Sequence, residues 1–241
     1  MKKLLIISLL LVGSAFVSVH AQELSAIRGY GNYNIAQGFN DGVTKAEGAG
    51  SGFELRFKLS EMFDIGLSGA YHTLKVEQPN AITLWKWDFW ENRNKNSIAS
   101  DLLNPDLSAD ISSAQRMEEY PILLSVRANF EVTEGLVVSP VVGGGVLFFV
   151  RSLDIIEKWQ RVYPTTGYVF KYEYKNFAPK KTGNPLIAIG GFDISYAFSE
   201  IVSVYGSGRY QYFVPTDNTM GYKALPYDAV LQGSIGLEFR Y

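Results

Sequence analysis

The final stretch of the chain, Val230–Tyr241, follows a period of two, with apolar and polar side chains alternating from Leu231 onward. Because successive side chains of a β-strand point to opposite faces, this pattern predicts a strand with one apolar and one polar face. The apolar face carries Leu231, Gly233, Ile235, Leu237, Phe239 and Tyr241. A strand of this kind fits an environment with lipid on one side and a polar interior on the other.

The same alternation recurs in seven earlier segments, so we expect eight strands. They span Leu24–Ala36, Ala49–Leu59, Phe63–Val76, Tyr120–Phe130, Leu136–Arg151, Leu186–Phe198, Ile201–Phe213 and the final Val230–Tyr241. In one register no outward-facing residue is charged, whereas the opposite register puts a charge on the outside of every strand. A basic residue near the bilayer midplane costs about 2–4 kcal/mol. The charge-free register is therefore the one we predict for a membrane strand.

The connections between these strands alternate in length, with tight turns after the second, fourth and sixth strands and long loops after the others. This asymmetry is typical of outer-membrane barrels, in which periplasmic turns are short and outer loops are long. The sequence therefore predicts an all-β fold, an eight-stranded antiparallel up-and-down transmembrane β-barrel. The segment Lys158–Tyr174 could add two membrane strands, giving ten. Charges lie on both faces of Ile156–Val162, so we favour a hairpin that projects above the membrane.

The N-terminus has the features of a secretory signal peptide. Lys2 and Lys3 precede an apolar run, Leu4–Val19, and small residues surround a cleavage site after Ala21. We expect residues 1–21 to be removed and residues 22–241 to form one barrel domain. The 22 basic and 24 acidic residues give no indication of nucleic-acid binding, and the absence of cysteine excludes disulfides and thiolate metal sites. We expect no cofactor.

Ser234, Gly236, Phe239 and Tyr241 resemble the C-terminal assembly signal of bacterial outer-membrane β-barrels. In pattern, nearly the whole mature chain resembles the small outer-membrane barrel families, namely OmpX- and OmpA-barrel-like proteins and porin-like barrels. The resemblance implies location in the outer membrane of a Gram-negative bacterium, contact with outer-membrane lipid and lipopolysaccharide, and recognition by the barrel insertion machinery. It identifies no extracellular ligand or protein partner.

The predicted register places many charged side chains in the barrel lumen. An eight-stranded barrel is just wide enough for side chains to fill it, and charges in so narrow a space must pair. We therefore predict a structural plug in which Glu54 and Glu238 pair with basic residues on neighbouring strands. The alternative is a narrow conduction path, whose basic excess would give weak anion preference. The expected lumen charges are Arg28, Glu54, Arg56, Lys58, Arg127, Arg151, Asp193, Arg209, Glu238 and Arg240.

The long loops carry most of the sequence-specific content. We expect a flexible segment at Glu91–Ser100 and a short helix around Ala109–Glu118. The loop aromatics form either a girdle at the membrane interface or a recognition surface for a partner or glycan. The candidate recognition residues are Trp85, Trp87, Trp90, Trp159 and Tyr168.

These features favour a non-enzymatic surface protein, structural or adhesive, that acts through its outer loops. The alternatives are a narrow porin-like channel, a barrel component of an export system, and, less favoured, a lipid A-modifying enzyme. Some small outer-membrane barrels of that last kind use histidine with serine or aspartate. After signal removal the one histidine is His72, and Ser68 on the same strand face lies about 13 Å away. We therefore predict no catalytic residues.

Overall fold

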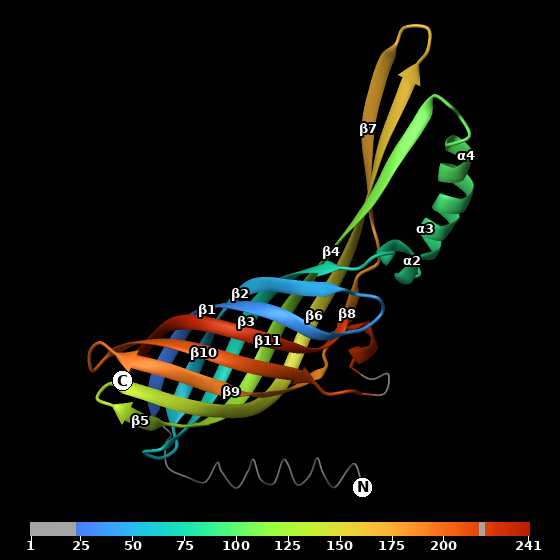
Figure 1. The fold of residues 1–241 in the computed structure, drawn as a ribbon. Coiled ribbons are helices and arrows are strands. Elements are labelled where there is room, and N and C mark those ends of the chain that lie inside the picture. The colour runs from blue at the N-terminus through green and yellow to red at the C-terminus, as the bar shows by residue number, and fades with distance from the viewer. Residues whose placement is uncertain (1–22, 217–219) are drawn as a thin grey trace.

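The computed structural model describes residues 23–216 and 220–241, apart from the side chain of Lys95. The predicted signal peptide lies outside the described residues. Eight antiparallel strands close into a ring, since each pairs with its neighbours and the first pairs with the last (Figure 1). In ring order these strands are β1 (Leu24–Phe39), β2 (Lys45–Lys58), β3 (Phe63–Glu77), β4 (Leu107–Ala128), β6 (Leu136–Tyr163), β9 (Leu186–Ala197), β10 (Val202–Phe213) and β11 (Tyr227–Arg240).

The eight-stranded barrel predicted from the sequence is thus confirmed. Burial alternates along the ring strands in the predicted register, with the polar residues inside. The outside carries a broad band of exposed apolar side chains, a surface suited to lipid rather than water. Members of this band include Phe53, Leu67, Ile122, Leu124, Val142, Phe192, Ile194, Leu231, Ile235 and Leu237.

None of the described helices is both long and apolar enough to cross a membrane.

Two strands of the ring continue far above the barrel. The outer parts of β4 and β6 pair with each other, and β7 (Tyr168–Phe177) pairs with the outer part of β6. The resulting three-stranded extension projects away from the ring (Figure 1), as expected for a hairpin outside the membrane. Two short strands complete the sheet: β5 (Phe130–Thr133), in the turn before β6, and β8 (Lys181–Gly183), beside β6 at the mouth of the barrel.

Helices lie against this extension in places that the sequence reading did not predict. They are α2 (Ala81–Leu84), α3 (Asp88–Asn92), the π-helix η1 (Arg93–Ile98) and α4 (Ala99–Asp101). The segment Glu91–Ser100, which we expected to be flexible, is helical throughout. The short helix expected around Ala109–Glu118 was wrong, because these residues belong to β4 and pair with β6.

The barrel interior is filled in two layers. The layer toward the periplasmic turns is charged, and the layer toward the outer mouth is mainly apolar, with a small polar cluster around His72 beside it. A single buried cluster forms the apolar layer, which the sequence reading did not anticipate. Its largest members are Leu74, Met117, Leu123, Leu147, Phe149, Ile187, Ile189, Phe213 and Tyr227.

Glycines on the two neighbouring strands allow close packing around Tyr30, whose ring faces the lumen. Tyr30 pairs with Gly52 of β2 and with Gly236 of β11. A Cβ atom at Gly52 would lie 2.6 Å from the Tyr30 ring, and one at Gly236 would overlap the carbonyl oxygen of Gly29. Gly236, one of the predicted insertion-signal residues, is therefore also required by packing.

Candidate functional site

Four arginines and four carboxylates form a connected network in the periplasmic half of the lumen. The side chains are all buried, with at most 7% of any residue exposed. They come from seven of the eight ring strands, so the network ties the barrel together across its lumen. Its members are Arg28, Arg56, Arg127 and Arg209 with Glu54, Asp64, Asp193 and Glu238.

Glu54 lies among three of these arginines. Arg127 donates a hydrogen bond to it, and the guanidinium groups of Arg28 and Arg209 each approach to 3.7 Å. Arg28 belongs to the neighbouring strand β1, whereas Arg127 and Arg209 reach Glu54 from β4 and β10. The pairing that the sequence predicted with neighbouring strands therefore extends across the lumen.

Glu238 and Asp64 complete the network at the periplasmic end. Glu238 accepts hydrogen bonds from Arg28, Arg56 and Arg240, and Arg56 also donates to Asp64. Asp64 was missing from the predicted lumen residues. It lies on the inward-facing side of β3, and this position could have identified it as a lumen residue.

The buried network is electrically balanced, with four positive and four negative groups. The basic excess expected from the sequence is absent from it for four reasons. Lys58 is exposed at the periplasmic end, the Arg240 side chain is 32% exposed, and Arg151 lies at the opposite end of the lumen. In addition, Asp64 contributes a fourth carboxylate. Balanced charges that hydrogen-bond to one another favour the plug over an anion-preferring path.

His72 is buried in the lumen and has polar partners. Its Nε2 lies 3.0 Å from Asn32 Nδ2 and its Nδ1 lies 3.4 Å from Glu119 Oε2, while Tyr227 donates a hydrogen bond to Glu119. Ser68 lies further down the same strand, where it pairs in register with Glu54, and His72 pairs with Gly50. The arrangement around His72 is that of a satisfied buried polar cluster.

The helices and the extended sheet form a second compact unit, which we call the outer module: residues 80–115 with residues 152–178. Its core contains Trp85, Trp90 and Trp159, which are only 3–5% exposed. These tryptophans therefore form neither an interface girdle nor a recognition surface, in contrast to both sequence-based interpretations. Large aromatic side chains are driven into a core wherever an apolar partner surface exists, here the inner face of the extension.

Glu157 holds the parts of the outer module together. Its carboxylate accepts two hydrogen bonds from Arg93 on the helical segment, both at 2.6 Å, one from Trp159 Nε1 on β6 and one from Asn176 Nδ2 on β7. Burial alone would raise the pKa of Glu157, but these hydrogen bonds, Arg93 foremost, bring that pKa below its usual value. The carboxylate is therefore the ionised centre of a polar network beneath the helices.

One face of β7 carries a row of aromatic side chains, Tyr168, Phe170, Tyr172 and Tyr174, which we call the aromatic strip. Tyr172 lies 5.5 Å, ring centre to ring centre, from both Phe170 and Tyr174. Tyr168, Phe170 and Tyr174 are 45–60% exposed, while Tyr172 stacks on the buried Trp159. Of the candidate recognition residues, Tyr168 therefore lies in this strip, and Trp87 is half-buried beside the helices.

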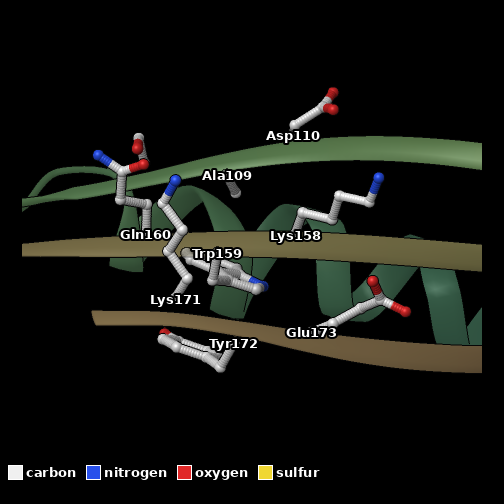
Figure 2. Close-up of a pocket in the computed structure, with 9 residues that line it drawn as sticks. Ala109, Asp110, Lys158, Trp159, Gln160, Lys171, Tyr172 and Glu173 are labelled. Carbon is white, nitrogen blue, oxygen red and sulfur yellow. The ribbon is translucent and has the colours of Figure 1, made fainter. Parts of the chain in front are cut away.

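The opposite face of the extension is polar. A shallow depression of about 690 Å³ crosses β4, β6 and β7 there (Figure 2). Asp110, Lys158 and Glu173 occupy one rung of the sheet and alternate in charge. This alternation makes the face well suited to water and leaves the aromatic strip as the apolar surface of β7. The polar side chains that line the depression are Ser108, Asp110, Lys158, Gln160, Lys171 and Glu173.

The molecule combines a closed ring of eight strands with an apolar exterior and a charge-filled lumen. The fold is that of a small outer-membrane β-barrel. No protein-family model and no curated protein sequence matches the chain.

The solved structures to which the chain is similar over 92% of its length include three outer-membrane proteins. They are a major outer membrane protein from Thermus thermophilus (12% identity, TM-score 0.45, 100% of that chain), Neisserial surface protein A (12%, 0.44, 100%) and the outer membrane protein OprG from Pseudomonas aeruginosa (10%, 0.43, 98%). The assignment of the fold rests on the strand ring itself and not on these distant likenesses.

Proposed function

We propose that this barrel is a non-enzymatic protein of the Gram-negative outer membrane that binds an extracellular partner through its outer module. The exposed aromatic strip on β7 is the observation that carries this proposal. It lies on a hairpin that projects beyond the barrel, where a partner can reach it (Figure 1).

The apolar exterior and the predicted signal peptide, cleaved after Ala21, support the location. In this environment the barrel contacts outer-membrane lipid and lipopolysaccharide. The exposed side chains of Phe239 and Tyr241 at the end of the chain are available to the insertion machinery that the resemblance implies. The barrel then serves as the anchor for the outer module.

The aromatic strip has the properties of a binding surface. Clustered exposed aromatics are unusual on a monomeric surface, and tyrosine is enriched where proteins bind partners. Alternate residues of a strand are about 6.6–6.8 Å apart, so four rings in a row present a narrow platform about 20 Å long. A platform of this shape fits an extended ligand, such as a glycan or a peptide segment, lying along β7.

The outer module also holds the strip rigidly. Tyr172 is fixed by stacking on Trp159, and Arg93 lies over the Tyr174 ring at 5.7 Å. Preorganised side chains lose little conformational entropy on binding, which favours affinity.

Removing two exposed rings of the strip is expected to abolish most of the binding. The test is a screen of the refolded protein against immobilised glycans and extracellular-matrix proteins, followed by affinity measurement on whatever is bound. We expect Phe170→Ala with Tyr174→Ala to weaken binding at least about thirtyfold, since a single aromatic hot spot is worth about 2 kcal/mol or more.

The matched control is Val169→Ala, which shortens an exposed side chain on the opposite face of the same strand. It should bind as the unaltered protein does. Equal binding by the double variant, with all proteins showing the same heat-modifiable gel shift, would contradict the proposed role of the strip.

A further inference from the structure

Arg151 is buried at the outer mouth of the barrel, where β6 leaves the ring. It is 2% exposed and lies between the apolar lumen layer and the outer module. The ring of Trp85, just after α2, covers it, with 5.1 Å between the guanidinium carbon and the ring centre. This position removes most of the water from a permanent positive charge.

The hydrogen-bond partners of Arg151 are neutral. Its Nε and Nη2 groups donate to Gln115 Oε1, at 3.0 and 2.8 Å, and Nη2 also donates to Gln78 Oε1 at 2.9 Å. Within residues 23–216 and 220–241, no carboxylate lies within ion-pair distance of Arg151. By contrast, each of the four buried arginines of the lumen network has a carboxylate partner.

A second cation lies beside Arg151. Lys181 of β8 is its register partner, and the Lys181 ammonium group is 4.5 Å from the centre of the Trp85 ring. Burial lowers the pKa of Lys181, and the positive charge of Arg151 lowers it further. The acid that acts in the other direction is Asp41, an exposed residue of the loop between β1 and β2. Two cations therefore share one indole ring, while Asp41, whose charge acts on both of them, is exposed to solvent.

This arrangement is unfavourable without an anion. A buried charge is expensive unless it is paired, and an indole ring compensates by only about 2 kcal/mol. Two adjacent cations without a paired carboxylate are suited to binding an oxyanion. An oxyanion accepts two parallel hydrogen bonds from an arginine and is attracted by the compact charge of a lysine.

The height of this cluster indicates the kind of oxyanion. Arg151 pairs in register with Met117, whose neighbours Arg116 and Glu118 are among the outward-facing charges that end the apolar band. The cluster therefore lies at the mouth of the lumen, inside the ring and at the height of the lipid headgroups. We propose that Arg151 and Lys181, with Trp85 as a wall, form a binding site for a phosphate group, either free or carried by a lipid headgroup.

The test is calorimetric titration of the folded barrel with inorganic phosphate, in a nonionic detergent and at constant ionic strength. Lys181→Gln is expected to weaken phosphate binding at least tenfold, since a charge-assisted hydrogen bond contributes more to binding than a neutral one. Lys180→Gln, which removes the adjacent exposed lysine, should leave it unchanged. Arg151→Gln should also abolish phosphate binding. If Arg151→Gln does not fold, the proposal is tested by Lys181→Gln alone.

A second arm separates the two sources of phosphate. The barrel is reconstituted in phosphatidylcholine vesicles with or without phosphatidic acid, and its unfolding midpoint in denaturant is measured. A headgroup ligand would raise the midpoint of the unaltered and Lys180→Gln proteins but not that of Lys181→Gln. Absence of an effect in both arms, or an equal effect on Lys180→Gln and Lys181→Gln, would overturn the proposal.

Discussion

Replacing Glu54 by alanine is expected to lower the free energy of unfolding of the barrel by about 3–5 kcal/mol. Glu54 is fully buried, and three arginines surround its carboxylate. Removing one partner of a buried ion pair leaves uncompensated charge in a space that water enters poorly. Asp193 also lies within ion-pair distance of the same three arginines, but one carboxylate cannot balance all of them.

The measurement is unfolding by denaturant in detergent or lipid, followed by the heat-modifiable gel shift, because all four tryptophans report on the outer module and not on the barrel. The matched control is Glu173→Ala, because Glu173 forms an exposed pair with Lys175 at 3.5 Å on β7. That variant should change the free energy by less than about 1 kcal/mol. A Glu54→Ala barrel as stable as this control would mean that the lumen network does not hold the barrel together.

Replacing Glu157 by alanine is expected to release the helices of the outer module while the barrel stays folded. The carboxylate accepts four hydrogen bonds, and its loss leaves Arg93, Trp159 and Asn176 without their common partner. We expect residues 81–101 to lose protection from hydrogen exchange by a factor of about 100 or more, corresponding to about 3 kcal/mol. The gel shift of the barrel should remain.

Asp110→Ala is the control for this variant, because Asp110 is an exposed acid on the opposite face of the same extension. It should leave the protection of the helices unchanged. Equal protection in Glu157→Ala and Asp110→Ala would show that apolar packing alone holds the helices.

Acid should reproduce the effect of Glu157→Ala. The pKa of Glu157 is lower in the folded module than in the unfolded chain. The stability that this group contributes is therefore fully present above the ordinary glutamate pKa of about 4.3, and it is lost as the pH falls through the lower folded value. The protection factors of the helices, corrected for the intrinsic exchange rate, should fall in that acidic range in the unaltered protein, and this fall should be absent from Glu157→Ala.

The ring of strands could be predicted because its signal is local. Every membrane strand must alternate between lipid and lumen, so the register of a strand such as β2 can be read from Phe53 and Glu54 alone. The limits of the strands were harder to predict. Above the membrane both faces of β4 and β6 meet water or protein, and the alternation between Glu157 and Lys158 no longer separates a lipid face from a polar one.

A site residue could be predicted when its position along its own strand determines its surroundings, and it could not when distant contacts determine them. The alternation of faces along each strand correctly placed Glu54 and Asp193 in the lumen among arginines. The same alternation also placed Lys58 in the lumen, although Lys58 is exposed. At a strand end a long side chain reaches solvent whatever its parity. The burial of Trp85 and Trp159 depends on helices docking against a distant strand pair, and no short-range pattern encodes that contact.

Single-channel recording in a planar bilayer tests most directly whether the barrel is a plugged anchor for its outer module. The refolded protein, after its heat-modifiable gel shift is confirmed, should insert and remain electrically silent, because the charged and apolar layers together fill the lumen. Discrete conductance steps that persist after deletion of residues 80–106 would contradict this account, since they would show an open path through the barrel itself.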